Sequence, residues 1–270
     1  MKLWVDGQPQ GTLAADDRGL TLADGHFTTM RVAQGQVCLW PLHRQRLTQT
    51  NRLLGLAQPD WAQVEAELKA ACAEVAQGCL RLTLTRGSAG RGYQGQFGVT
   101  PRRVLALSEY PSHYASWQRD GIRAAVAHQR LAQGGALVGH KTLGRTEQVL
   151  LKREAQLRQL PELVVLSQQG EVIEATAGNL FVWLDGQWHT PALSHCGIAG
   201  VMRQHLLSLL PSLGLPVRVA PLSVAQLKDC QAAFISNCLM GLVPLIELDG
   251  RPLPIHPTIQ TITEAGTLWR

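Results

Sequence analysis

The sequence predicts an α+β protein built from two subdomains. Strand-like and helix-like runs are mixed along all 270 residues, and 45% of the residues are hydrophobic, enough for one large core or two small ones. Only 17% are charged, so intrinsic disorder is not expected. A stretch rich in proline, serine and histidine interrupts the pattern at residues 110–118. We therefore expect an N-terminal subdomain over residues 1–109, a linker over 110–118 and a larger C-terminal subdomain over 119–270.

Two helices follow an opening series of strands and turns in the first subdomain. Asp-Gly and glycine turns mark the strands, and an aspartate or a glycine marks the helix ends. The predicted elements are a strand at Leu3–Val5, a hairpin of Arg31–Ala33 and Val37–Trp40 around Gly35, a helix at Leu42–Leu54 closed by Gly55, a helix that Asp60 caps and Gly78 ends, and strands at Leu80–Thr85 and Val104–Ser108 around a glycine-rich loop at residues 86–93.

The second subdomain mixes strands and helices around glycine-rich segments. The same turn and capping signals set its boundaries. The predicted elements are a strand at Ile122–Ala127, a glycine-rich segment at 134–144, a helix at Thr146–Gln159, strands at Leu163–Ser167, Val172–Glu174 and Asn179–Leu184, a helix from about Gly200 to Pro211, a short helix from Ser223, and strands at Ala233–Ser236 and Leu245–Leu248.

Charge and cysteine usage exclude several classes of function. The net charge of +5 favours small anionic ligands, but no lysine or arginine run with interleaved aromatics indicates nucleic-acid binding. We expect no membrane segment and a cytoplasmic location, because the N-terminus lacks a signal-peptide core and no run approaches the ~20 apolar residues of a membrane helix. The six cysteines form no CxxC pair and no metal-ligand spacing appears, so we expect reduced thiols and no metal.

Lysine is rare in this chain, which has only five, against twenty arginines. Lys141 differs from the others because residues 134–144, GGALVGHKTLG, are small and apolar. Desolvation disfavours an ammonium group, so such a lysine is a candidate for Schiff-base chemistry. The alternative is a lysine on an ordinary glycine-rich loop, and the local context alone leaves both open.

Three further patterns suit the binding of an anionic cofactor. Glu174 ends an apolar strand, where a carboxylate needs a cationic partner. Residues 196–203, CGIAGVMR, form a glycine-flanked helix start, whose free N–H groups attract anions. Arg46 could clamp a phosphate with its guanidinium group. The first two patterns also have a plain structural explanation, as a surface strand residue and an ordinary capped helix.

Four elements appear together in a characteristic order. They are H-x-x-R-L (His43, Arg46, Leu47), a lysine followed by a helix, E-x4-N-x-F (Glu174, Asn179, Phe181) and a G-I-x-G helix start. This set spans about residues 3–250 and resembles the fold-type IV pyridoxal-phosphate (PLP) enzymes. That family includes branched-chain aminotransferases, D-amino-acid transaminases and a lyase branch that releases pyruvate from 4-amino-4-deoxychorismate. The resemblance implies a two-subdomain D-amino-acid aminotransferase-like fold, PLP as cofactor and a homodimer.

Three motifs are similar to the lyase branch of this family. Residues 24–31, DGHFTTMR, match its D-G-x-F-T-T-x-R pattern, where transaminases tend to have F-E-x-x-R. Residues 86–93, RGSAGRGY, depart from R-G-x-G-G-R-G-Y only at Ala89. Residues 196–203 also fit the lyase form. The resemblance thus implies conversion of 4-amino-4-deoxychorismate to 4-aminobenzoate and pyruvate, a step of folate biosynthesis.

The resemblance also assigns cofactor contacts to this chain. It implies that Lys141 is the Schiff-base lysine and the base that removes the substrate proton, and that Glu174 pairs with the pyridine nitrogen of PLP. It implies that Arg46 and the backbone amides of Ile198 and Ala199 hold the phosphate.

Further positions correspond to phosphate-binding or substrate-binding residues of the family. Cys238 stands where many transaminases have a threonine that binds the phosphate. Thr29 resembles the residue that assists proton delivery to the leaving group, as a relay or positioning donor. Arg91 is the expected contact for a substrate carboxylate, Tyr93 lines the entrance and Asn237 faces the substrate.

Two alternative functions are kept. A PLP-dependent aminotransferase of branched-chain or D-amino acids would use the same Lys141 and Glu174. A non-catalytic anion-binding protein would account for the positive charge alone, and its affinity would fall steeply with salt.

Overall fold

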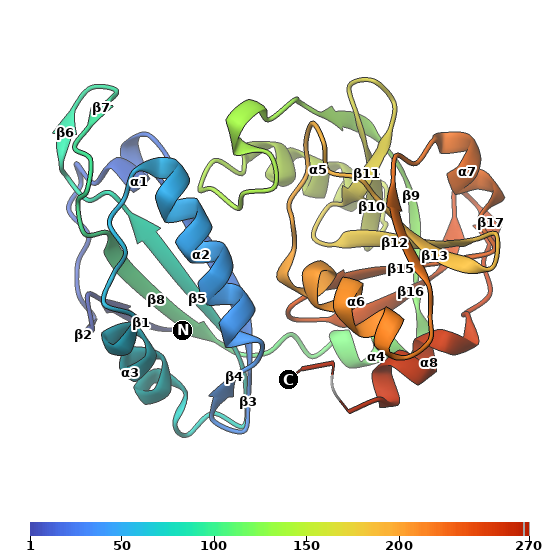
Figure 1. The fold of residues 1–270 in the computed structure, drawn as a ribbon, viewed down its shortest axis with the longest axis horizontal. Helices are drawn as coiled ribbons and strands as arrows, with labels where there is room; N and C mark the ends of the chain where they lie inside the picture. Colours follow the sequence, from blue (N-terminus) through green and yellow to red (C-terminus); the bar gives the residue numbers. More distant parts are fainter. Residues whose placement is uncertain (267, 270) are drawn as a thin grey trace. The chain divides into compact units, whose positions relative to one another are not determined.

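The structure, a computed structural model, describes residues 1–266 and 268–269, which form two compact units (Figure 1). The first unit comprises Met1–Pro111 together with His140–Gly144, and the second comprises Ser112–Gly139 together with Arg145–Arg270. Each unit combines a large sheet with helices. This confirms the predicted mixture of strands and helices.

The division of the chain differs from the predicted boundaries in two ways. The expected linker at 110–118 contains most of a helix, α4 (Tyr114–Asp120), whose Tyr114 and Trp117 pack against the core of the second unit. Lys141, expected in the C-terminal subdomain, belongs to the first unit. The reason is backbone pairing: the N–H of Phe27 donates to the carbonyl of Lys141 over 3.1 Å, and His26 forms a bridge with Thr142.

The first unit is an antiparallel sheet covered by two helices (Figure 1). Its strand order is β2-β1-β8-β5-β3-β4, and a separate hairpin joins β6 to β7. Its elements are β1 (Lys2–Val5), β2 (Gln8–Pro9), α1 (Arg18–Thr21), β3 (Gly25–Ala33), β4 (Gln36–Val37), α2 (Trp40–Leu54), α3 (Trp61–Cys72), β5 (Gln77–Thr85), β6 (Gly90–Arg91), β7 (Gln94–Gly95) and β8 (Arg102–Ser108).

Strand alternation builds the core of this unit. Successive side chains of a strand point to opposite faces, so every second residue of β3, β5 and β8 is buried under α2 and α3. The buried set is Met30, Val32, Leu47, Val64, Leu68, Cys72, Leu80, Leu82, Leu84, Leu105 and Leu107. Thr29 belongs to the other face of the sheet, away from α2 and α3.

Three predicted boundaries in this unit were wrong. The strand predicted to begin at Arg31 begins at Gly25. The strand predicted at Val37–Trp40 stops at Val37, because Leu39 takes a left-handed conformation (φ 57°) and α2 starts at Trp40 with Pro41 in its first turn. The helix predicted to end at Gly78 ends at Cys72, and Gly78 lies in β5. A Cβ at position 78 would come within 2.8 Å of the Val75 side chain, so this glycine permits close packing rather than ending a helix.

The second unit is built on a nine-stranded mixed sheet. Its order is β11-β10-β9-β16-β15-β12-β13-β14, with β17 paired to β16. Its elements are α4, β9 (Ile122–Leu131), a 3-10 turn η1 (Gly135–Leu137), α5 (Thr146–Leu157), β10 (Glu162–Ser167), β11 (Val172–Ala175), β12 (Asn179–Leu184), β13 (Gln187–Pro191), α6 (Val201–Ser212), β14 (Val217–Ala220), α7 (Val224–Asp229), β15 (Ala232–Asn237), β16 (Gly241–Leu248), β17 (Arg251–Pro252) and α8 (Pro257–Glu264).

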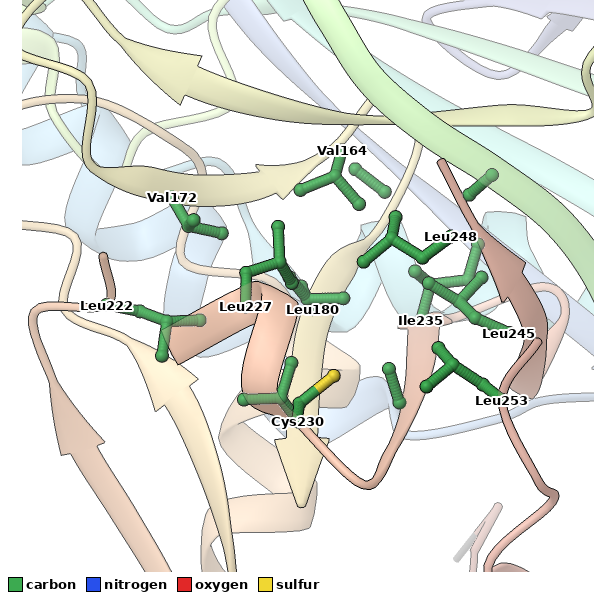
Figure 2. Packing of buried hydrophobic residues seen from close by; sticks show 14 of the residues in the cluster. Val164, Val172, Leu180, Leu222, Leu227, Cys230, Ile235, Leu245, Leu248 and Leu253 are labelled. Atoms are coloured by element: carbon green, nitrogen blue, oxygen red, sulfur yellow. The ribbon is translucent and has the colours of Figure 1, made fainter. Parts of the chain in front are cut away.

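Both faces of this sheet are packed. One face forms the aliphatic cluster shown in Figure 2, in which Leu180, Ile235 and Leu245 from central strands meet Leu227 of α7. On the opposite side, Leu151 of α5 packs against a second cluster that includes residues of β9, β10 and β11. Burial on both faces explains why these strands are continuous apolar runs in the sequence.

A buried ion cluster links two glycine-containing motifs of the first unit. Arg86 donates from Nε to Asp24 Oδ2 over 2.7 Å and from Nη2 to Asp24 Oδ1 over 3.1 Å. Arg18 adds a third bond to the same carboxylate, over 2.9 Å. Burial raises the pKa of Asp24, but the bonds from Arg86 and Arg18 outweigh it and hold the pKa below its usual value. Arg86 also donates to the carbonyls of Leu54 and Gln96.

Replacement of Arg86 should therefore destabilise the protein strongly. We expect Arg86→Met to lower the free energy of unfolding by about 3–5 kcal/mol, because it leaves the Asp24 carboxylate buried with one cation fewer. Arg102→Met is the matched control, since Arg102 pairs with Asp6 where the side chains are 46% and 32% exposed, and should cost about 1 kcal/mol or less. Denaturant titration measures both, and equal losses would contradict the expectation.

Candidate active site

Lys141 lies on a short extended segment held against β3. Its carbonyl accepts from the N–H of Phe27, and the N–H of Leu143 donates to the carbonyl of Gly25 over 3.0 Å. The Lys141 amine is half-buried and lies 4.7 Å from the centroid of the Phe27 ring. The preceding His140 contacts α2, with 2.9 Å between its Nδ1 and Thr50 Oγ1. These contacts fix the backbone that presents the amine.

A polar seam joins β3 to α2 beneath this segment. Thr28 Oγ1 lies 2.6 Å from His43 Nδ1 and accepts a short hydrogen bond from Arg46 Nη2. His26 Nε2 lies 2.6 Å from Asn51 Oδ1. Residues 43, 46, 47, 50 and 51 share one face of α2, as helical periodicity requires, so the H-x-x-R-L motif is the inward face of a helix. The structure thus places Arg46 in the same unit as Lys141.

Burial keeps the histidines of this seam neutral near pH 7. It lowers the pKa of His26 to about 4, and it lowers the pKa of His140. For His43, burial and then the positive charge of Arg46 hold the pKa well below its usual value. Neutral rings can each accept one hydrogen bond and donate one, which a protonated ring cannot do.

Thr29 lies on the opposite face of β3 from Thr28. It is half-buried and pairs in register with Arg81 of β5. The guanidinium of Arg81 lies 3.8 Å from the centroid of the Phe27 ring. Because Phe27 and Thr29 are two residues apart, they share this face with the Lys141 contact. Phe27 and Arg81 were not recognised from the sequence.

Glu174 occupies β11 in the second unit and is almost fully buried, with 5% of its surface exposed. Its Oε2 accepts from the N–H of Ile198 over 2.9 Å, and Asn179 Nδ2 lies 3.5 Å away. Asn179 in turn donates to the carbonyl of Ile198 over 2.9 Å. The E-x4-N-x-F and G-I-x-G motifs therefore meet at this carboxylate.

Only glycine fits at position 197 beside the carboxylate. Gly197 has φ 91°, and a Cβ there would lie 2.7 Å from Ile173 Cγ2 and 3.5 Å from Glu174 Oε2. The loop can thus approach closely enough for the N–H of Ile198 to reach Glu174.

The amides of Ile198 and Ala199, which the resemblance assigns to the phosphate, both have acceptors within the chain. The N–H of Ile198 donates to Glu174, and the N–H of Ala199 donates to the carbonyl of Gly139 over 3.0 Å. Both donors expected to bind a phosphate therefore already have protein acceptors. The amides that a helix leaves without an intrahelical acceptor lie next along the chain, in the first turn of α6, whose N-cap is Gly200.

Two arginines give Glu174 cationic surroundings within its own unit. Burial is the larger effect on Arg145 and Arg203 and lowers the pKa of both, while the negative charge of Glu174 raises it. Glu174 therefore has two arginines in its electrostatic surroundings, and a carboxylate in this position suits pairing with a protonated pyridine nitrogen.

The remaining predicted residues fall into two groups. Asn237 uses both ends of its amide within the chain: Oδ1 accepts from the N–H groups of Leu239 and Met240 over 2.8 Å, and Nδ2 donates to the carbonyl of Ala177 over 2.8 Å. It shapes the turn that contains the buried Cys238. Arg91 and Tyr93 instead belong to the β6–β7 hairpin and are exposed, Tyr93 to 95%.

The donor set fits PLP. The cofactor has an aldehyde, a pyridine nitrogen and a phosphate, and the chain offers a half-buried amine at Lys141, a buried carboxylate at Glu174 and a guanidinium at Arg46 that a buried threonine fixes. An amine condenses with an aldehyde, a carboxylate holds a proton on a pyridine, and a guanidinium binds phosphate.

Comparison with known proteins identifies the family. Residues 25–248 match the family described as Amino-transferase class IV. The chain belongs to this family. Its members are PLP-dependent enzymes, so the alternative of a non-catalytic anion-binding protein is not supported.

Three similar proteins illustrate this membership of the class IV family. An aminodeoxychorismate lyase from Vibrio harveyi is 34% identical over 242 residues, covering 90% of this chain and 89% of the relative. The crystal structure of 4-amino-4-deoxychorismate lyase from Pseudomonas aeruginosa has a TM-score of 0.91 and 34% identity, with 97% of each chain covered. A hypothetical aminotransferase from Mycobacterium tuberculosis in PLP-bound form has a TM-score of 0.85 and 26% identity, covering 98% and 96% of the chains.

Neither membrane spans nor metal-binding clusters are evident in the described part of the chain. Among residues 1–266 and 268–269, no helix is both long and apolar enough to cross a membrane. Within the same residues, no group of three or more histidine, cysteine, aspartate or glutamate side chains could hold a metal ion.

The buried His26 should make stability depend on pH. Its folded pKa of about 4 lies below the ordinary value of 6.5, so the unfolded state binds the proton first as the pH falls. Its contribution is present above about pH 6.5 and is lost as the pH falls toward 4. Between about pH 7 and pH 4.5, wild type should lose roughly 2–3 kcal/mol more than His26→Gln. Denaturant titrations at both pH values measure this, and parallel losses would refute the assignment.

Proposed function

We propose that this protein is an aminodeoxychorismate lyase, which converts 4-amino-4-deoxychorismate to 4-aminobenzoate and pyruvate. The observation that best supports this proposal is the 34% identity to the Vibrio harveyi lyase across 90% of this chain. The site agrees with it, because the lyase-type motifs at residues 24–31 and 86–93 share one unit, where Arg86 joins them through Asp24. This product makes the enzyme a contributor to folate biosynthesis.

The three cofactor-binding groups have separate tasks in this proposal. Lys141 holds the aldehyde carbon of PLP through its amine, Arg46 binds the phosphate, and Glu174 keeps a proton on the pyridine nitrogen. PLP, when bound, supplies an electron sink for the substrate carbon that loses its proton. Glu174 can hold the proton on the pyridine nitrogen because the N–H of Ile198 fixes the position of its carboxylate. For Ile198 and Ala199 we propose a supporting task, holding the loop, in place of direct phosphate binding.

Proton transfer falls to Lys141 and Thr29. We propose that the freed Lys141 amine takes the proton from the carbon bearing the substrate nitrogen. The aromatic ring of Phe27 beneath it limits the directions from which the amine can act. Thr29 relays or positions a proton for the leaving group. The bond between the ring carbon and the ether oxygen breaks, and the released enolpyruvate takes up a proton to become pyruvate. Aromatisation of the ring favours the forward direction.

Substrate contacts are assigned to Arg91, Tyr93 and Asn237, and a phosphate-side position to Cys238. The support for Arg91 and Tyr93 is the R-G-x-x-G-R-G-Y motif, since the side chains are exposed. The support for Asn237 and Cys238 is their place in a turn at the end of β15. A homodimer and a cytoplasmic location complete the proposal, on the ground of the family resemblance.

An aminotransferase is the second candidate. The observation in its favour is the likeness, at 26% identity, to the hypothetical aminotransferase from Mycobacterium tuberculosis. Such an enzyme would use the same Lys141 and Glu174 but would transfer the amine instead of eliminating pyruvate.

Product analysis separates these two candidates. Purified enzyme supplied with 4-amino-4-deoxychorismate should release 4-aminobenzoate and pyruvate in equal amounts. D-alanine or leucine with 2-oxoglutarate tests the aminotransferase in parallel. Formation of glutamate with no 4-aminobenzoate would disprove the lyase assignment.

Lys141→Ala should abolish both the colour and the reaction. We expect purified wild type to be yellow and its colour to be fixed by borohydride at Lys141, whereas the variant binds no PLP covalently. Activity should fall by about 10³-fold or more, because the base is removed. Lys69→Ala is the control, since Lys69 is an exposed lysine of α3 in the first unit. Absorbance, borohydride trapping and peptide mass measurement report the result, and a fully active colourless Lys141→Ala would contradict it.

A further inference from the structure

The Thr28 hydroxyl lies between two groups of α2. It accepts a short hydrogen bond from Arg46 Nη2 and lies 2.6 Å from His43 Nδ1. Thr28 and His43 have no exposed surface, so water does not compete for these bonds. Both residues belong to the first unit, as Arg46 does.

The donors and acceptors of these three side chains indicate the direction of each hydrogen bond. The guanidinium of Arg46 can only donate, so Thr28 Oγ1 accepts from it. The hydroxyl of Thr28 still has one proton to donate, and we assign it to His43 Nδ1, the ring nitrogen 2.6 Å away, which then acts as the acceptor. The proton of the neutral ring therefore sits on Nε2, which is buried without a hydrogen-bond partner among the described residues. A buried N–H without an acceptor lowers the stability of the fold, so the favourable hydrogen bond of the His43 ring is the one at Nδ1.

This arrangement restricts the guanidinium of Arg46. One N–H is tied to a threonine of β3 that has no exposed surface, and the bond from the Thr28 hydroxyl to His43 Nδ1 restrains this side chain. An arginine side chain otherwise loses substantial rotamer freedom when it binds an anion. A guanidinium already fixed in place binds with less of that loss.

We propose that Thr28 and His43 are positioning residues that orient Arg46 and thereby set the affinity of the protein for the phosphate group of its cofactor. This proposal rests on the proposed function, since it takes the ligand of Arg46 to be the phosphate of PLP. Neither residue touches the ligand in this account. Their effect reaches it through the guanidinium alone.

Lys141 has a separate support, which makes the proposal testable. Its segment is held by the backbone of β3 and by His140, whose Nδ1 lies 2.9 Å from Thr50 Oγ1. Thr50 donates its own proton to the carbonyl of Arg46 over 3.0 Å, so it accepts from His140. Loss of the Thr28 hydroxyl should therefore affect the phosphate end of the cofactor and leave imine formation by Lys141 unchanged.

The experiment compares PLP with pyridoxal, which lacks the phosphate. Each is titrated into the full-length protein freed of cofactor, and the imine absorbance gives its dissociation constant. Thr28→Val keeps the shape of the side chain and removes the hydroxyl. We expect it to raise the Kd for PLP about 10-fold, the size of a lost hydrogen bond to a charged group, with the Kd for pyridoxal changed less than about twofold.

Two variants serve as controls. Thr28→Ser restores the hydroxyl and should restore the wild-type ratio of the two dissociation constants. Thr85→Val removes another buried threonine hydroxyl of the same sheet, bonded to Asp17 over 2.9 Å and not to Arg46. It should leave the ratio unchanged. If Thr28→Val does not fold, His43→Phe replaces it, with a rise of about threefold expected for PLP alone.

The outcomes separate the two proposals. A PLP-selective loss in Thr28→Val that Thr28→Ser reverses supports the positioning role. Equal changes for PLP and pyridoxal, an unchanged ratio, or the same change in Thr85→Val would each overturn it and leave the lyase proposal intact. Failure of the wild-type protein to form an imine with PLP would overturn the proposed function itself.

Discussion

The pairing of a five-residue segment with β3 is the constraint on which the first unit's part of the site depends. His140–Gly144 belongs to the first unit although the chain on both sides of it belongs to the second. Two backbone hydrogen bonds hold it there: the N–H of Phe27 donates to the carbonyl of Lys141, and the N–H of Leu143 donates to the carbonyl of Gly25. Because a lysine side chain is long and flexible, its chemistry is only as well directed as the backbone that carries it. The same strand also contains Thr28 and Thr29, so β3 organises the amine, the guanidinium and the proposed proton relay.

The buried polar residues of the two units differ in chemical type. In the first unit, the seam between β3 and α2 consists of neutral groups around one cation, whereas Glu174 in the second unit is a buried carboxyl group that accepts from a backbone N–H. A buried carboxylate is stable only when hydrogen-bond donors or cations are near it. Each unit thus offers a different group to a cofactor that carries both a phosphate and a pyridine nitrogen.

Much of the fold was predictable because local signals were strong. Asp60 caps α3 as expected, Gly55 ends α2, and Ser223 forms a capping box for α7. The missed elements include β13 and α8, although the Asp185-Gly186 turn precedes the first and Pro257 begins the second. They also include β14 and α4, which have no buried residue, so no burial pattern marks them in the sequence. Single residues of the site could be named from motifs. Their partners could not, since the hydrogen bond from Arg46 to Thr28 joins residues 18 positions apart through tertiary packing. The role of the Ile198 amide also depends on the loop geometry that Gly197 allows.

The neutrality of the three seam histidines has an electrostatic consequence. Since His26, His43 and His140 are uncharged near neutral pH, they add no positive charge beside Arg46 and Lys141. The attraction that the seam exerts on an anion therefore comes from Arg46, whose guanidinium stays protonated. Because His26 and His43 have strongly lowered pKa values, a change of pH near 7 leaves their part of the seam uncharged. The buried imidazoles thus supply hydrogen bonds without turning the site into a pH sensor.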